Sequence, residues 1–319
     1  MTMKPNPMVI LTGPTAVGKT ALSIALAKKI NGAIISADSM QVYKYMDIGS
    51  AKIMPEEMDG VRHYLVDELD PSDEFHVVRF VGMAKQALKE ITANGQIPIV
   101  VGGTGFYIQA LLYDIDFTEQ ECDSAYRRQL EELAETRGNH YLHEMLKAVD
   151  PASAEAIHEN NRKRVIRALE FYHESGERIS EHNERESQKT SPYNFAYFVL
   201  NDDREKLYRR IDARVDAMVK AGLVDEVARL QQMGCHADMV SMQGLGYKEI
   251  LAYLNGTSTL EEAIYIIKRE SRHFAKRQLT WFRRERDVIW LNKPDFEYDD
   301  TKILTYMMDV LQAKGILPA

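Results

Sequence analysis

The stretch GPTAVGKT, residues 13 to 20, has the G-x-x-x-x-G-K-[ST] spacing of a phosphate-binding loop. The apolar run MVILTG leads into it and an amphipathic stretch, residues 20 to 30, follows it, so the loop joins an expected strand to an expected helix. Glycines let backbone N–H groups converge on phosphate oxygens, and the helix N-terminus adds a favourable dipole. Lys19 would supply positive charge, and the Thr20 hydroxyl would be a ligand of Mg²⁺. The predicted phosphate-binding residues are Gly13, Pro14, Thr15, Ala16, Val17, Gly18, Lys19 and Thr20. The pattern does not say which phosphate is bound.

Two further polar side chains follow expected strands. Asp38 comes after the run AIISA, and Thr104 comes after IPIVVGG. A carboxylate beside the phosphate loop could be a general base or a metal ligand, but it could equally cap a helix or close an Asx-turn. The Thr104 hydroxyl could donate to a leaving-group oxygen, or cap a helix that begins near Phe106. The residue types alone leave both roles open.

A nucleotide hydrolase or kinase also needs a carboxylate that holds the metal at the end of a strand. The nearest match is YLVDE, residues 64 to 68. Only a short apolar run precedes Asp67, and a turn-like LDPSDEF follows, so we favour a solvated strand end there. Without a clear metal-holding carboxylate, the sequence gives less support to a nucleotide hydrolase.

The elements that would position these groups alternate along the chain. The runs MVILTG, AIISAD and IPIVVGGTG are separated by helical segments, one of them from Val77 to Ala93. Buried strands separated by helices predict a doubly wound parallel sheet, with ligands beyond the carboxyl ends of the strands. From residue 118 to 192 the pattern is helical without strands, and FAYFVL then indicates a strand, followed by helices to the C-terminus. We therefore predict an α/β core of residues 1–117 and 193–319 and an all-helical insertion of residues 118–192.

Composition is that of an ordinary globular protein, with 45% hydrophobic residues and a net charge of −8. No apolar run approaches the ~18 residues of a membrane span, and the N-terminus does not look like a signal peptide. We expect a cytoplasmic protein with no membrane partner, in which Cys122 and Cys235 are thiols.

One strip of the sequence departs from this acidic balance. Residues 268–286 carry eight Lys/Arg and two Asp/Glu. On a helix Arg269, Arg272 and Lys276 would share a face suited to nucleic-acid phosphates. We expect the aromatic residues of the strip in the core rather than as stacking platforms: Phe274, Trp281 and Phe282.

Several longer motifs occur together in one order: GPTAVGKT, ISADSMQVYKYMDIGSAK, VVGGTGFYIQALL, GLVDEV, QGLGYKEI and AKRQLTWFRRE. Over nearly its whole length the chain resembles the bacterial tRNA dimethylallyltransferase family. The resemblance implies a P-loop NTPase-like core, Mg²⁺, and transfer of a dimethylallyl group from dimethylallyl diphosphate to N6 of the adenosine 3′-adjacent to the tRNA anticodon. The loop would then hold a diphosphate rather than a triphosphate.

The resemblance also implies a role for each catalytic residue. Asp38 would be the general base for the adenine amine, and Thr104 would lie at the bridging oxygen of the diphosphate. An arginine of RRIDAR would meet the diphosphate, and we assign that role to Arg214, with Arg210 one turn away.

The adenosine has to leave its stack to react, which predicts a flipped base. The resemblance implies that DSMQ reads this base, and that RKRVI and QGLGYK contact the tRNA anticodon stem-loop. RKRVI taken alone would equally fit a solvated helix face. The implied tRNA-binding residues are Asp38, Ser39, Met40, Gln41, Arg162, Lys163, Arg164, Val165, Ile166, Gln243, Gly244, Leu245, Gly246, Tyr247 and Lys248.

Three alternatives share the phosphate loop: a small-molecule kinase, an RNA-stimulated ATPase, and an enzyme that prenylates free adenine nucleotides. The insertion and the basic strip favour a macromolecular substrate over the last of these. Nothing in the sequence requires more than a monomer.

Overall fold

The computed structural model describes residues 6–116 and 125–318. The chain divides into two compact units: the core unit, residues 1–112 with 192–319, and the helical unit, residues 113–191. The expected boundary at residue 117/118 and the expected thiol of Cys122 lie outside the described residues. Cys235 is a buried free thiol. No helix in the described ranges combines the length and the apolarity that crossing a bilayer would require.

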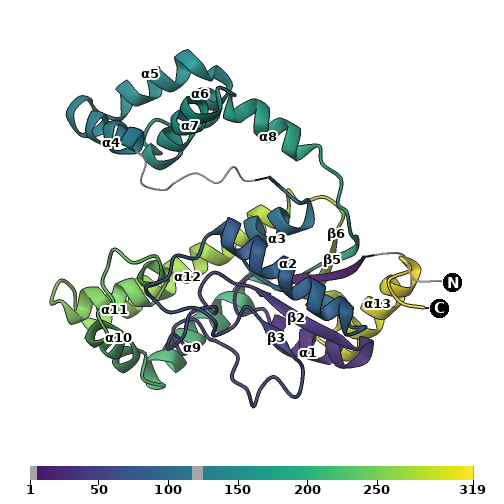
Figure 1. The fold of residues 1–319 in the computed structure, drawn as a ribbon. Helices are drawn as coiled ribbons and strands as arrows, with labels where there is room; N and C mark the ends of the chain where they lie inside the picture. Colours follow the sequence, from purple (N-terminus) through teal and green to yellow (C-terminus); the bar gives the residue numbers. More distant parts are fainter. Residues whose placement is uncertain (1–5, 117–124, 319) are drawn as a thin grey trace. The chain divides into compact units, whose positions relative to one another are not determined.

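The core unit is built on one parallel sheet with the strand order β3-β2-β4-β1-β5-β6 (Figure 1). β1 lies between β4 and β5, and its interior residues from Met8 to Leu11 are fully buried. The predicted α/β class with helices flanking a parallel sheet is confirmed. The strands are β1 Pro7–Thr12, β2 Gly32–Ala37, β3 His63–Tyr64, β4 Ile97–Gly102, β5 Asn194–Asn201 and β6 Val288–Asn292.

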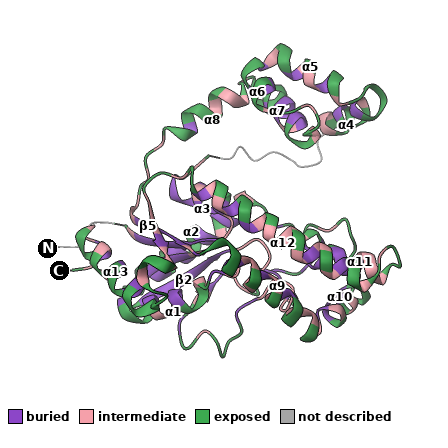
Figure 2. Ribbon diagram, turned by 180° about the vertical axis from the view of Figure 1, so that it is seen from behind, coloured by how far each residue is buried: buried purple, intermediate pink, exposed green. Residues whose placement is uncertain are grey.

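Helices cover the sheet and bury its apolar side chains, as the burial colours show (Figure 2). α1 packs with α13, and Leu26 and Ile303 belong to one buried cluster with Val9 and Leu11 of β1. The Val77–Ala93 helix is confirmed as α2. The helices of the core unit are α1 Lys19–Ile30, α2 Val77–Ala93, α3 Gly105–Leu112, α9 Arg204–Lys220, α10 Leu223–Gln232, α11 Tyr247–Leu254, α12 Leu260–Phe282 and α13 Asp300–Ala313, with short 3₁₀ turns η1 Ser241–Gln243 and η2 Lys293–Phe296.

One expectation for the C-terminal region is wrong. We expected helices only, but Val288–Asn292 is strand β6, which pairs in parallel with β5. β-branched Val288 and Ile289 and aromatic Trp290 favour extended backbone. Five residues at the sheet edge are too few to show a clear alternation in the sequence.

The helical unit contains helices and no strand in its described residues. Its own apolar core includes Leu130, Leu142, Leu146, Val165 and Leu169. Its helices are α4 Ala125–Arg137, α5 Asn139–Val149, α6 Pro151–Ala156, α7 Arg162–Ser175 and α8 Ile179–Ser187.

Candidate active site

The phosphate loop opens onto a pocket of about 550 Å³ in the core unit, beyond the carboxyl ends of β1, β2 and β4. Residues of the loop, the segment after β2, α9 and α12 line it. A pocket therefore lies at the carboxyl ends of these strands, where a ligand site is expected. Of the residues predicted from sequence, the pocket brings together Thr15, Ala16, Gly18, Lys19, Thr20, Asp38, Gln41 and Arg214.

Other predicted residues shape the loop or neighbouring turns without lining the pocket: Gly13, Pro14, Val17, Ser39, Met40 and Thr104. A Cβ at Gly13 would lie 2.3 Å from the carbonyl oxygen of Leu200, and its φ of +149° is unfavourable for other residues. Val17 is packed in the core. The Thr104 carbonyl accepts the N–H groups of Tyr107 and Ile108 at 3.0 and 3.2 Å, so this residue starts α3 immediately after pocket-lining Gly103.

Lys19 is folded back onto its own loop. Its Nζ donates to the carbonyl oxygens of Gly13 and Pro14 at 3.0 and 2.9 Å. The pKa of Lys19 is lowered to about 8, mainly by burial and in part by the nearby charge of Arg214, while Asp38 opposes the shift. A bound anion would stabilise the protonated amine.

Asp38 forms an Asx-turn and still has a carboxylate oxygen for chemistry. Its Oδ1 accepts the N–H groups of Met40 and Gln41 at 2.8 and 3.2 Å. Oδ2 has no hydrogen-bond partner among the described residues. The turn fixes the side chain at the pocket wall, so the structural and the chemical role suggested by the sequence are compatible.

Two of the three arginines of RRIDAR, Arg210 and Arg214, line the pocket, and they differ in their partners. Arg210 pairs through Nη2 with the buried Asp202, while its Nε is buried without a partner. Arg214 has no ion pair or hydrogen bond within the described part of the chain, and burial lowers its pKa. Together with Lys19 they make three cations against two carboxylates, Asp38 in the pocket lining and Asp202 paired with Arg210. This balance favours an anionic ligand.

Two pocket residues were not expected from the sequence: Gln278, and Phe274, which was expected in the core. Both come from α12 and line the pocket, one helical turn apart. Gln278 hydrogen-bonds the phosphate loop and the turn after β4. Phe282 is in the core as expected, whereas Phe274 is half-buried at the pocket. No local pattern marks Gln278, because its partners are 263 and 175 residues away in the sequence.

A second missed feature is a buried clamp behind the pocket. The Glu226 carboxylate, on α10, accepts the N–H groups of Asp47, Ile48 and Gly49 at 3.0, 2.7 and 3.0 Å. It also accepts the Tyr247 hydroxyl at 2.8 Å. The next two residues, 50 and 51, line the pocket.

The position of Tyr247 in this clamp contradicts its expected contact with RNA. Tyr247 is 0% exposed, and its oxygen accepts the Ser50 N–H at 3.1 Å, so its side chain is closed to RNA. A Cβ at Gly49 would lie 2.6 Å from the Tyr247 ring, and one at Gly244 would lie 2.6 Å from Met40. The segments DSMQ and QGLGYK therefore pack on one another. Gln243 and Lys248 remain exposed, while Leu245 is half-buried and Gly246 is buried.

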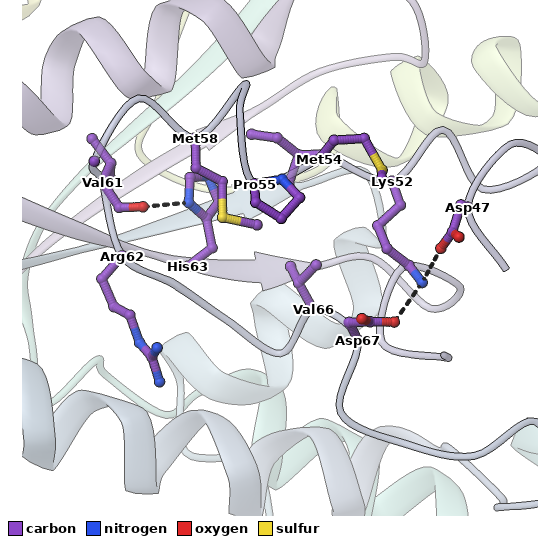
Figure 3. A pocket seen from close by; sticks show the side chains of 12 residues that line it. Asp47, Lys52, Met54, Pro55, Met58, Val61, Arg62, His63, Val66 and Asp67 are labelled. Carbon is purple, nitrogen blue, oxygen red and sulfur yellow. Dashed lines mark hydrogen bonds and ion pairs between the residues drawn. The ribbon is translucent and has the colours of Figure 1, made fainter. Parts of the chain in front are cut away.

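A separate pocket of about 580 Å³ contains Asp67, the carboxylate considered for metal binding (Figure 3). Lys52 lies between Asp47 and Asp67, and its Nζ donates to them at 2.7 and 2.8 Å (Figure 3). A third bond, 2.6 Å long, goes to the Tyr43 carbonyl. Asp67 does not line the phosphate pocket, so the arrangement gives no support to a kinase-type or ATPase-type metal site.

The side chains of the phosphate-loop pocket fit Mg²⁺ that would bind together with a phosphate. No group of three or more His, Cys, Asp or Glu side chains suited to a metal occurs in residues 6–116 and 125–318. Mg²⁺ often uses only one or two protein oxygens, with substrate phosphates and water completing its shell. The Thr20 and Asp38 side chains are oxygen donors that line this pocket, so they fit that mode.

RKRVI has two sides in the helical unit. Lys163 and Arg164 are exposed, and Arg162 donates to the Glu131 carbonyl at 2.6 Å. Val165 and Ile166 are 0% and 3% exposed in the core of this unit. Their side chains are therefore closed to RNA, in contrast to our expectation from the motif.

Acidic residues of α9 neutralise part of the basic strip. Arg272 pairs with Asp212, and Lys268 pairs with Asp216 at 2.6 Å. Lys276 is exposed, and the Arg277 guanidinium lies over the Phe274 ring. The free positive charge of α12 is therefore concentrated in its C-terminal half.

Comparison with known proteins covers almost the whole chain. The IPP transferase family model matches residues 41–285, and an isopentenyl transferase model matches residues 7–74. A tRNA dimethylallyltransferase of Lachnoclostridium phytofermentans is 63% identical over 98% of this chain and 99% of its own length.

Solved structures agree with these matches. The tRNA isopentenylpyrophosphate transferase of Bacillus halodurans has a TM-score of 0.73 at 45% identity, covering 98% of each chain. A eukaryotic dimethylallyltransferase acting on tRNA has a TM-score of 0.82 at 30% identity, covering 95% of this chain and 78% of that one. The phosphate loop, the parallel sheet and these matches together show that the chain belongs to the IPP transferase family.

Proposed function

We propose that this tRNA dimethylallyltransferase-type enzyme transfers a dimethylallyl group from dimethylallyl diphosphate to N6 of the adenosine 3′-adjacent to the anticodon. The observation that carries the proposal is one pocket, beside the phosphate loop, that Asp38 lines together with Lys19, Arg210 and Arg214. N-prenylation needs a base, such as a carboxylate, and a positively charged site that binds the diphosphate. The enzyme would act as a cytoplasmic monomer.

The chemistry of the acceptor explains the need for a base. The lone pair of the adenine amine is delocalised into the ring, so the amine is a poor nucleophile. As N6 bonds to C1 of the dimethylallyl group, the C1–O bond breaks and its electron pair leaves with the diphosphate. Asp38 Oδ2 accepts the N6 proton in this step.

The leaving diphosphate gains charge as the C1–O bond breaks. Lys19, Arg214 and the loop N–H groups bind it, and their attraction grows as this charge develops. Thr104, at the start of α3, would donate its hydroxyl to the bridging oxygen. The Thr20 hydroxyl would hold Mg²⁺, which would supply further charge neutralisation to the leaving diphosphate.

RNA recognition involves both units. Gln41 lines the pocket and its amide offers a donor and an acceptor to a flipped adenine. In the helical unit, exposed Lys163 and Arg164 would bind the phosphate backbone, which positions RNA without reading its sequence. Exposed Gln243 and Lys248 of QGLGYK are further candidate contacts.

Mass spectrometry of unmodified tRNA, incubated with the protein, Mg²⁺ and dimethylallyl diphosphate, tests the reaction. We expect a gain of one C₅H₈ unit on the adenosine beside the anticodon. No mass gain, with phosphate released from ATP in a parallel incubation, would refute the proposal and favour the kinase or ATPase alternatives.

The lowered pKa of Lys19 predicts a pH dependence of donor binding. The anion binds the protonated amine, so the pKa rises on binding and affinity falls as pH increases above about 8, the pKa of the free protein. We expect up to tenfold weaker binding per pH unit above that value, because one proton is taken up. Calorimetry with dimethylallyl diphosphate and no RNA, between pH 7 and 9.5, measures the affinity. Comparing buffers of different ionisation enthalpy measures proton uptake, and zero uptake at pH 9 would contradict the assignment.

Arg164→Ala is expected to weaken tRNA binding. It should also make the negative slope of log affinity against log salt shallower by about one, for one lost phosphate contact. Filter binding at several salt concentrations measures both. The matched control is Arg137→Ala, an exposed arginine at the end of α4 in the same unit. Equal effects of the two substitutions would mean that Arg164 contributes only general positive charge.

A further inference from the structure

The Gln278 side chain hydrogen-bonds the backbone of the phosphate loop at Thr15. It lies in α12, is 6% exposed, and lines the pocket. Its Oε1 accepts the Thr15 N–H at 2.9 Å, and its Nε2 donates to the Gly103 carbonyl at 3.0 Å. One side chain thus ties the loop after β1 to the turn after β4.

The orientation of this amide is determined by its partners. Thr15 N–H can only donate and the Gly103 carbonyl can only accept, so the oxygen has to face the loop and the nitrogen the turn. A Cβ at Gly103 would lie 2.1 Å from Gln278 Nε2, so the glycine permits this close approach. The amide therefore cannot rotate to offer a donor to the loop side without losing both bonds.

The bond to Gln278 removes one donor from the phosphate loop. Loops of this kind bind phosphates through converging N–H groups, and each phosphate needs its own set. The Thr15 N–H already donates to Gln278 Oε1, so the negative end of the amide dipole lies where a phosphate oxygen would otherwise accept this N–H. An additional phosphate at that end of the loop would have to displace the amide or face its oxygen.

The size of the pocket does not distinguish a diphosphate from a triphosphate. The pocket of about 550 Å³ is much larger than a triphosphate group. The donors therefore decide how long a phosphate chain binds well.

We propose that Gln278 is a specificity-determining residue, which restricts the loop to diphosphates by occupying the Thr15 N–H that a third phosphate would use. The inference rests on the proposed function, in which the loop binds a diphosphate donor. It assigns the exclusion of nucleoside triphosphates to one side chain outside the loop.

Binding of inorganic pyrophosphate and of inorganic tripolyphosphate, measured by calorimetry with Mg²⁺, tests the proposal without turnover. We expect the wild-type protein to bind pyrophosphate at least tenfold more tightly than tripolyphosphate. Gln278→Ala frees the Thr15 N–H, and it should reduce this preference by tenfold or more. Gln278→Met keeps the side-chain length but not the acceptor, and should change the preference in the same direction. Gln312→Ala, an exposed glutamine on α13, is the matched control and should leave it unchanged.

The outcomes separate this inference from the function on which it rests. An unchanged preference in folded Gln278→Ala or Gln278→Met would overturn the role of Gln278 while the proposed function stands. Wild-type protein that binds tripolyphosphate as tightly as pyrophosphate would also overturn it. Wild-type protein that binds neither pyrophosphate nor dimethylallyl diphosphate would remove the proposed function itself. Thermal melting identifies a variant that fails to fold, and Gln278→Met, which preserves volume, then decides.

Discussion

Asp38→Asn is expected to reduce the rate of prenyl transfer by about 10²–10⁴-fold, the range for loss of a general base. The asparagine keeps an oxygen that accepts the N–H groups of Met40 and Gln41, so the turn at the pocket wall persists. It cannot take up the N6 proton. Single-turnover transfer to tRNA measures the chemical step, and calorimetry with dimethylallyl diphosphate checks that donor binding stays within a few-fold of wild type.

The control for this substitution is Asp67→Asn. Asp67 is the carboxylate that a kinase or ATPase interpretation would place on the metal, and the amide oxygen of the substituted side chain can still accept the bond from Lys52. We expect its transfer rate to stay near wild type. A transfer rate near wild type in Asp38→Asn would reduce Asp38 to a turn-forming residue. A large loss in Asp67→Asn instead would favour the rival chemistry.

Glu226→Ala is expected to lower the free energy of unfolding of the core unit on the order of 3 kcal/mol. The carboxylate is 1% exposed and accepts three N–H groups and one hydroxyl. Without it these donors lose a charged partner, and water replaces it only in part, because hydrogen bonds to a buried charge are among the strongest in a protein. Urea denaturation followed by circular dichroism measures the change.

Asp225→Ala provides the comparison for Glu226→Ala, because Asp225 is the neighbouring acid in the first turn of α10 and is more accessible to solvent. We expect it to lose less than about 1 kcal/mol, as for an acid that favours a helix N-terminus. Glu226→Gln should fall between the two, since an amide keeps one acceptor but turns N–H groups toward other donors. Equal losses in Glu226→Ala and Asp225→Ala would show that the clamp contributes no more than a surface charge.

Local patterns in the sequence determined the elements that carry the site. Alternating apolar runs and amphipathic stretches identified β1, β2, β4 and α2, and placed the phosphate loop, Asp38 and Thr104 after strand ends. These are short-range features, in which residue type sets backbone preference within a few positions.

Only the tertiary structure decided what surrounds these groups. Gln278 meets Thr15 across 263 residues of chain, and Glu226 meets the loop of residues 47–49 across 177 to 179 residues. Arg210 and Arg214 are both arginines one turn apart, and pairing with the buried Asp202 distinguishes the first from the second. Val165, Ile166 and Tyr247 stand in motifs beside exposed basic residues, yet packing buries them. Motif spacing cannot reveal such contacts, because a side chain's partners depend on how distant elements pack, whereas its backbone conformation depends mainly on its neighbours in sequence.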